Sequence, residues 1–397
     1  MWSAGGYSSI DRQLLGDFAD ATGISVHLIP ASESSSQRLR QESNLLASRS
    51  AGVDVVQIDT VWVSQLAEHL IDLRSALQDR ISDELPDTIE NATLRNRIVA
   101  APLAVGYGLL FFRTDLLTKY GFSRPPATWD DLEKQARQIQ RGERRSGHSQ
   151  FWGYVWQGAE YEGLTCNALE WQSSQRGGIF VTAARESNVF NGPAVKAFAR
   201  AAGWVGTISP PGVIAYMEED ARNVWQSGNA AFMRNWAYVY PLASSDSHLQ
   251  GRFSVAPIPA QGDWHSSVLG GWYLGVPSFS TRQKDAITFV QYMTSKSTQI
   301  RRAVSGGFWP TLKSAYRDPS IQSASSVFHV AEQIATRVVR RPASVLGPLY
   351  PCASELYARG VHEILARKAS AALGAQRLQA ALQNLLNAPR SSQQGCQ

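Results

Sequence analysis

Residues 53–59 read Val-Asp-Val-Val-Gln-Ile-Asp, a short apolar run that is typical of a buried strand and ends at Asp59. Apolar residues at helical spacing precede this run over 37–47 and follow it over 61–70, and another strand is predicted over 24–29. Strands that alternate with helices indicate an α/β lobe with a mainly parallel sheet.

Asp59 is the first candidate contact with a ligand. In sheets of this kind, ligands bind beyond the carboxyl ends of the strands, and Asp59 lies at such an end. A carboxylate that directly precedes a helix also serves as an N-cap. The residues alone leave these two interpretations equal.

Length and charge bound the class of protein. A single hydrophobic core stops growing at about 250–300 residues, so 397 residues predict two lobes. The net charge is +5, but the 31 arginines and seven lysines are scattered among acidic residues, and the densest basic cluster, 141–145, contains Glu143. Because nucleic-acid binding requires a concentrated basic face, we expect no nucleic-acid partner.

The cysteines and the apolar runs narrow the class further. Cys166, Cys352 and Cys396 lie far apart, without a CxxC pair or a His/Cys cluster, so no zinc site is expected. A disulfide would leave one free thiol, which we expect at Cys396. No apolar run has the ~20 residues of a membrane span. The first residues have no signal-peptide pattern, so we expect a cytoplasmic protein or one whose signal has been removed.

An aromatic stretch follows at 225–241, Trp-Gln-Ser-Gly-Asn-Ala-Ala-Phe-Met-Arg-Asn-Trp-Ala-Tyr-Val-Tyr-Pro. It predicts the end of a helix, a short buried strand from Ala230, and then rings that alternate with polar groups through Trp236 and Tyr238. Such rings suit a flat, amphipathic ligand such as a sugar, which has an apolar C–H face and a rim of hydroxyls. Packing of these rings in the core is the alternative.

The remaining pattern places further elements along the chain. A pair of buried strands is predicted over 98–112, and single strands over 254–259 and 267–277. Long helices are predicted over 325–339 and 354–386.

Motifs of several enzyme classes are absent from the sequence. It contains no P-loop, GxGxxG, HExxH or GxSxG motif, which favours binding over catalysis and predicts no cofactor and no metal. A glycoside hydrolase remains an alternative, because two of the acids near aromatic residues could form a catalytic pair, although their spacing selects none: Glu160, Glu162, Glu170, Glu218, Glu219 and Asp220.

Taken together, several motifs resemble the extracellular solute-binding proteins of ABC importers, in the branch that binds sugars. The resemblance runs through nearly the whole chain and is carried by the order and spacing of residues 54–59, 108–117, 126–132, 226–232 and 270–272. Residues 151–158 with 161–164, Arg234-Asn235-Trp236 and Arg341-Pro342 look most like the trehalose/maltose-binding proteins.

This resemblance implies a periplasmic-binding-protein-like α/β fold with the ligand cleft between two lobes. The expected N-terminal lobe contains residues 1–110 and 271–327, and the C-terminal lobe contains 111–270 and 328–397. The three hinge crossings are expected near 107–113, 268–273 and 325–330.

The resemblance also implies a set of site residues. Asp59 and Arg341 would hydrogen-bond sugar hydroxyls. Trp236, Tyr238 and Trp272 would stack on the sugar rings, with the Gly271 backbone close by. Ser32 matches a hydroxyl contact.

At four positions the sequence departs from the trehalose/maltose pattern. A Tyr and an Asp that flank the position of Val105 are replaced by Ala104 and Gly106. An acid is replaced by Ser9 and an arginine by Gln37. Each change removes a ring or a charge from the expected site, so the identity of the sugar is open while sugar binding is retained.

The sequence therefore predicts the binding component of an ABC sugar importer, which captures an α-glucosidic disaccharide by hinge closure and delivers it to the permease subunits. We expect a monomer in the periplasm or another extracytoplasmic compartment, without enzymatic activity. The alternatives are a glycoside hydrolase with aromatic subsites and a non-catalytic scaffold that binds protein.

Overall fold

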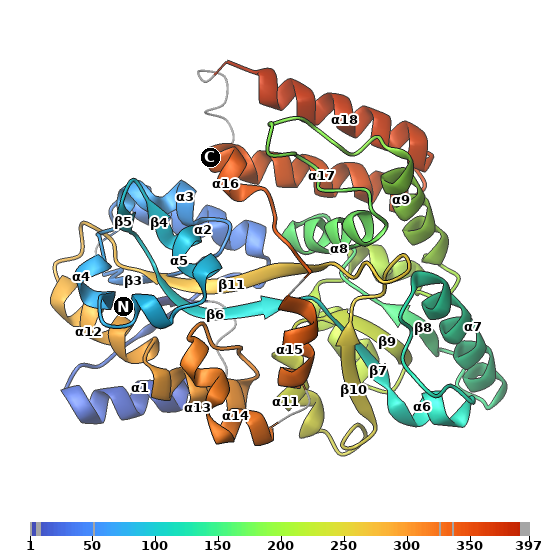
Figure 1. Ribbon diagram of the computed structural model, residues 1–397, viewed down its shortest axis with the longest axis horizontal. Helices are drawn as coiled ribbons and strands as arrows, with labels where there is room; N and C mark the ends of the chain where they lie inside the picture. Colours follow the sequence, from blue (N-terminus) through green and yellow to red (C-terminus); the bar gives the residue numbers. More distant parts are fainter. Residues whose placement is uncertain (1, 5–8, 51, 325–326, 336, 390–397) are drawn as a thin grey trace. The chain divides into compact units, whose positions relative to one another are not determined.

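The computed structural model describes residues 2–4, 9–50, 52–324, 327–335 and 337–389. The chain divides into two compact units, which we call unit 1 (Met1–Gly106 with Gly270–Phe328) and unit 2 (Tyr107–Leu269 with His329–Cys396). It passes between them three times, within β6 (Ala101–Tyr107), β11 (Ser267–Gly275) and α15 (Val327–Ala335) (Figure 1).

Unit 1 is built on a sheet whose centre is β3. In this sheet β1 pairs in parallel with both β2 and β3, β11 pairs antiparallel with β3, and β6 pairs with β11. All five residues of β3 are buried, as the apolar run predicts. In this sheet β1 spans Trp2–Ala4, β2 spans Leu28–Pro30 and β3 spans Val55–Asp59. A separate hairpin consists of β4 (Thr93–Leu94) and β5 (Arg97–Ile98).

The helices of unit 1 precede and follow these strands, which confirms the predicted α/β alternation (Figure 1). They are α1 (Ser9–Thr22), α2 (Ser35–Ala47), α3 (Val63–Leu66), α4 (Arg74–Leu77), α5 (Pro86–Ala92), α12 (Gln283–Met293), α13 (Lys296–Gly306) and α14 (Pro319–Ala324).

Unit 2 has a sheet of its own, in the order β10-β7-β9-β8. β7 pairs antiparallel with β9 and β10, and β8 pairs in parallel with β9. The strands are β7 (Leu109–Arg113), β8 (Trp152–Val155), β9 (Ala230–Asn235), β10 (Phe253–Pro257) and β12 (Val338–Val339), the last of which pairs with Ser267 and Val268 of β11.

The helices of unit 2 include a packed group in which α17 contacts α8, α9 and α18 (Figure 1). The helices are α6 (Thr114–Lys119), α7 (Trp129–Arg145), α8 (Glu162–Ser174), α9 (Gly192–Trp204), α10 (Glu218–Gln226), α11 (Val239–Ser244), α16 (Ala343–Leu346), α17 (Tyr350–Leu365) and α18 (Ala371–Asn387).

Two sequence predictions about strands are wrong. The expected pair over 98–112 is not a hairpin, because β6 pairs with β11 and β7 pairs with β9 and β10. Continuous apolar runs mark burial, but they do not say which strand is the neighbour. The helix expected over 325–339 ends at Ala335, and Val338–Val339 form β12, whose backbone hydrogen bonds to β11 prevail over the helical pattern.

Two other predictions need smaller corrections. The helix expected over 354–386 is two helices, α17 and α18, and Arg367 between them adopts a left-handed φ of 57° that ends the first. Ser370 then caps the second by accepting a hydrogen bond from Leu373 N. Cys166 is a free, buried thiol and not a member of a pair, while Cys396 lies outside the described residues.

Candidate functional site

Asp59 and Trp272 meet in unit 1, where they lie directly opposite each other in the pairing of β3 with β11. Asp59 is buried and Trp272 is half-buried. Asp59 Oδ1 accepts a hydrogen bond from Val61 N at 3.1 Å, so the carboxylate caps the turn after β3. The capping interpretation therefore holds for this oxygen, and the position at the carboxyl end of the strand suits ligand binding as well.

The ring of Trp272 is supported by two neighbours. The Arg38 guanidinium lies 4.7 Å from the ring centroid, and the Trp62 ring meets it edge-on at 6.0 Å. A cation over an aromatic face is attracted by the ring's quadrupole. Arg38 is buried, and its Nε and Nη2 donate to the Ser32 carbonyl at 3.1 and 2.9 Å, which fixes the guanidinium.

Ser32 and Gln37 join this cluster from the start of α2. Ser32 Oγ donates to Gln37 Oε1 at 2.8 Å, and the Ser32 carbonyl holds Arg38. Ser34 caps α2, so that the first turn presents Gln37 and Arg38 next to the loop. The structure therefore brings Ser32 and Gln37 together and links them through Arg38 to Trp272.

Gly271 lies where two backbones approach closely. A Cβ atom at Gly271 would lie 2.7 Å from the Ala104 carbonyl of β6, so a side chain at this position would push the two strands apart. Gly106 is half-buried on β6, and Ser9 is exposed at the start of α1. Among the residues that the structure describes, no hydrogen bond joins Ser9 or Gly106 to Trp272.

Trp236 is the central aromatic residue of unit 2 and follows the end of β9. Its half-buried ring has the Arg234 guanidinium 4.0 Å from its centroid, and Nε1 donates to Glu218 Oε1 at 3.3 Å. The contacts of face and edge fix the orientation of the ring. This is the kind of rigid aromatic surface on which a sugar stacks.

A buried ion pair holds Arg234 beneath this ring. Arg234 Nε and Nη2 bind the two oxygens of Glu170 at 2.9 and 2.7 Å, and the two side chains are 0% and 1% exposed. Burial lowers the pKa of Arg234, but the adjacent Glu170 outweighs burial and holds the pKa above its usual value. The guanidinium is therefore charged throughout the physiological pH range.

Two tyrosines bind the acids at the start of α10. Tyr161 OH donates to Glu218 Oε2 and Tyr238 OH donates to Glu219 Oε1, each at 2.5 Å. Burial, followed by the neighbouring carboxylates, raises the pKa of both phenols well above the usual value. Both tyrosines are therefore neutral donors, and Tyr238 lies in the same cluster as Trp236.

Arg341 has a different environment in unit 2. It is buried, its Nη1 binds Glu162 Oε1 at 2.8 Å, and its Nη2 donates to the Leu269 carbonyl at 3.4 Å. Tyr350 and Ser354 also donate to the Glu162 carboxylate. Arg341 is thus held in a network of side chains at the unit 2 end of β11, and its expected contact with sugar stays a prediction.

The acids considered for glycoside hydrolysis are occupied in other ways. Glu162 and Glu170 form buried pairs with arginines, and Glu160 pairs with Arg359. Glu218 and Glu219 accept from the tyrosines, and Asp220 Oδ2 accepts from Met217 N as part of the α10 cap.

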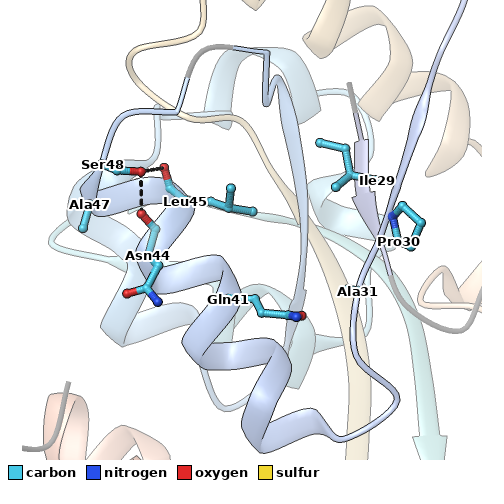
Figure 2. A pocket seen from close by; sticks show the side chains of 8 residues that line it. All are labelled: Ile29, Pro30, Ala31, Gln41, Asn44, Leu45, Ala47 and Ser48. Atoms are coloured by element: carbon cyan, nitrogen blue, oxygen red, sulfur yellow. Dashed lines mark hydrogen bonds between the residues drawn. The ribbon is translucent and has the colours of Figure 1, made fainter.

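A surface cavity of about 690 Å³ lies elsewhere on unit 1, between β2 and α2 (Figure 2). Ser48 Oγ, at one end of it, donates to the carbonyls of Asn44 and Leu45. None of the predicted site residues lines the cavity, whose lining is Ile29, Pro30, Ala31, Gln41, Asn44, Leu45, Ala47 and Ser48. It therefore does not identify the candidate site.

Sequence reasoning missed the residues that support the two tryptophans. Arg38 belongs to no recognisable sequence motif, and only the fold places it over Trp272. Arg234 belongs to a stretch that was singled out, but its role follows from its pairing with Glu170, 64 positions away. Within the described part of the chain, no cluster of His, Cys, Asp or Glu could hold a metal ion, and no helix is long and apolar enough to span a membrane.

Comparisons with known proteins agree with this architecture. The model of the bacterial extracellular solute-binding protein family matches residues 13–329. A probable ABC transporter-binding protein of Deinococcus radiodurans is 39% identical over 356 residues, which cover 89% of this chain and 84% of that protein.

Two solved structures extend the comparison. Maltose-bound MalE3 of T. maritima is 32% identical, with a TM-score of 0.91 over 97% of this chain and 98% of that one. An ABC transporter solute-binding protein of Thermotoga lettingae, bound with alpha-D-tagatose, is 22% identical with a TM-score of 0.87 over the same shares, and at this identity it shows the fold alone.

The family match covers most of the chain, and the two-lobe fold agrees with that of the maltose-bound structure at a TM-score of 0.91. We conclude that the chain belongs to the bacterial extracellular solute-binding proteins, a family that binds solutes and does not catalyse reactions.

Proposed function

We propose that this protein is the substrate-binding component of an ABC sugar importer and that it captures an α-glucosidic disaccharide of the maltose/trehalose class. The observation that carries the proposal is Trp236, a half-buried ring fixed by Arg234 on its face and by Glu218 at its edge. The maltose-bound structure of T. maritima, 32% identical over nearly the whole chain, supports this choice of ligand.

The chemistry of the cluster around Trp236 suits a sugar. Its ring offers an apolar face to the C–H face of a pyranose, and the Glu218 and Glu219 carboxylates beside it are acceptors for hydroxyls. In unit 1, Trp272 would serve as another platform, with Asp59, Ser32 and Gln37 as the polar contacts.

Titration calorimetry with maltose, trehalose and sucrose, each run separately, tests the proposal. We expect one of them to bind at one site per chain. Trp236→Ala should weaken that binding by about 1–3 kcal/mol, because the stacking surface is lost. Failure of all three sugars to bind would refute the proposed ligand class.

Trp152 offers a matched control for the Trp236 variant. It is also half-buried, and the Arg144 guanidinium lies 4.4 Å from its ring centroid. Trp152 lies at the start of β8, beside the start of β9, whereas Trp236 follows the end of β9. Trp152→Ala should leave the affinity unchanged. Equal losses in the two variants would show that Trp236 acts through stability and not through contact.

The partners and the location belong to the same proposal. We infer that the protein is a monomer outside the cytoplasm and that it delivers its ligand to the permease subunits after hinge closure. A mass of 43.6 kDa by light scattering would support the monomer. Sugar-dependent stimulation of ATP hydrolysis by the reconstituted transporter would support delivery, and a sugar-dependent decrease in the radius of gyration would support closure.

A further inference from the structure

Phe308 stands out in unit 1 because its side chain is half-buried while residues 306, 307 and 309–312 are buried. It follows α13, which ends at Gly306 and is capped by Gly307 with a left-handed φ of 68°. The Phe308 ring packs against Gly306. A Cβ atom at Gly306 would lie 2.7 Å from Phe308 Cδ2 and 3.1 Å from Ile10 Cγ2 of α1. Two glycines therefore allow this ring to lie at the surface beside the start of α1.

Backbone contacts place Phe308 in one row with the predicted ligand contacts of unit 1. Thr60 N, next to Asp59, donates to the Gly271 carbonyl at 3.1 Å. Gly271 is in close contact with the Ala104 backbone, as its missing Cβ shows. Val105 N then donates to the Trp309 carbonyl at 3.0 Å.

The pairing of Val105 with Trp309 also determines which residue lies opposite Phe308. Val105 and Trp309 form an antiparallel bridge, so Gly106 is opposite Phe308 in register. Side chains opposite each other in an antiparallel pair share one face. Because Gly106 has no side chain, β6 contributes no side-chain atoms to this face directly opposite Phe308.

The ring of Phe308 has the same kind of support as those of Trp236 and Trp272. The Arg302 guanidinium lies 4.4 Å from its centroid. Arg302 Nε binds Asp11 Oδ1 at 2.7 Å and its Nη1 donates to the Leu103 carbonyl at 3.3 Å, with the Arg302 and Asp11 side chains 3% and 1% exposed. The ring is therefore held in a fixed orientation from below.

We infer that Phe308 is a ligand-binding residue, which offers an apolar surface to the C–H face of a saccharide ring beside Gly106, where β6 contributes no side chain. This inference rests on the proposed function and extends it. It makes the ligand site of unit 1 more apolar at this end than a site with a polar side chain at position 106. Phe308 would then favour sugars that present an unsubstituted ring face there.

Calorimetry of Phe308→Ala with the sugar that the wild type binds tests the inference. We expect the Kd to rise by about tenfold, as for the loss of an aromatic contact at an interface. Phe308→Tyr should stay close to the wild type, because it keeps the ring face. Trp152→Ala is the control, because the arginine–ring distance at Trp152 is 4.4 Å, as at Phe308. It should leave the Kd unchanged, and it measures how removal of an arginine-supported ring elsewhere in the protein affects binding.

The outcomes separate the inference from the proposed function. An unchanged Kd in Phe308→Ala, with Trp236→Ala weakened, would overturn the role of Phe308 alone. Absence of sugar binding by the wild type would overturn both. If Phe308→Ala does not fold, Phe308→Leu retains the apolar volume without the ring, and an unchanged Kd in that variant would also overturn the inference.

Discussion

Trp236 in unit 2 and Trp272 in unit 1 have similar surroundings but different supports. Each ring is half-buried with a buried arginine near its face, at 4.0 Å for Arg234 and 4.7 Å for Arg38. Arg234 is bound by the carboxylate of Glu170, whereas Arg38 donates to the backbone carbonyl of Ser32. The same aromatic surface is thus anchored once by a buried ion pair and once by a loop.

This difference concerns stability as much as binding. The Glu170–Arg234 pair also holds the backbone, because Glu170 Oε1 accepts from Val268 N of β11 at 3.1 Å. A Cβ atom at Gly108 would lie 1.9 Å from the same Glu170 oxygen, so the chain after β6 is shaped around the pair. A buried charge that loses its partner is costly, whereas a lost hydrogen bond to a loop costs less. The two supports should therefore respond differently to mutation.

Glu170→Ala should have the largest effect. It leaves the Arg234 guanidinium buried without its partner, which we expect to lower the free energy of unfolding by about 3–5 kcal/mol. Urea unfolding followed by Trp fluorescence measures this loss.

Glu355→Ala is the matched control for that change, because it removes an exposed ion pair. The side chains of Glu355 and Arg359 are 56% and 47% exposed. Its effect should be below about 1 kcal/mol. If the two variants lost similar free energies of unfolding, the buried ion pair would contribute no more to stability than the exposed one, contrary to this prediction.

Arg38→Met should have an intermediate effect. Methionine retains apolar packing against Trp272 but loses the hydrogen bonds to the Ser32 carbonyl, so we expect a loss of about 1–2 kcal/mol in the free energy of unfolding. Sugar affinity should fall as well, because Trp272 and Ser32 lose their common anchor.

Arg144→Met is the matched control for Arg38→Met. Arg144 lies over Trp152 and its Nε donates to the Phe151 carbonyl at 2.9 Å, which repeats the arrangement in unit 2 away from Trp236. A similar loss of stability with unchanged affinity is expected. If Arg144→Met weakened sugar binding as much as Arg38→Met, the assignment of Trp272 to the ligand site would be contradicted.

The smallest effect concerns two buried carboxylates, one in each unit. Burial favours a raised pKa of Glu143 in unit 2, but hydrogen bonds from Lys119, Tyr120 and His148 outweigh it and lower the pKa. For Glu84 in unit 1, burial prevails over Arg80 and raises the pKa. On acidification Glu143 should therefore contribute a loss of stability and Glu84 a gain.

The pH dependence of urea unfolding checks these signs. Glu143→Gln should cost about 1 kcal/mol at pH 7, where the carboxylate is charged and accepts its hydrogen bonds. The difference from the wild type should vanish as the pH falls through the lowered pKa of Glu143, because the wild-type carboxyl is then protonated too. A difference that does not shrink anywhere along the acid limb of unfolding would show that the charge of Glu143 is not responsible.

The amino-acid sequence predicted those features that depend on local pattern. The buried run at β3 placed Asp59 at a strand end, and the alternation of strands and helices indicated an α/β lobe. Trp236 follows β9, as the aromatic stretch suggested. In each case the information lies within a few residues of the feature, in periodicity, turn residues and caps.

Contacts between distant segments were decided only by the tertiary structure. Val338–Val339 became a strand because β11 offered a partner, against the helical pattern around them. Arg234 and Arg38 became the supports of two tryptophans through Glu170 and Ser32, and Phe308 came opposite Gly106 from about 200 positions away. Pairing and burial of this kind depend on which surfaces the folded chain brings together, and no local pattern encodes them.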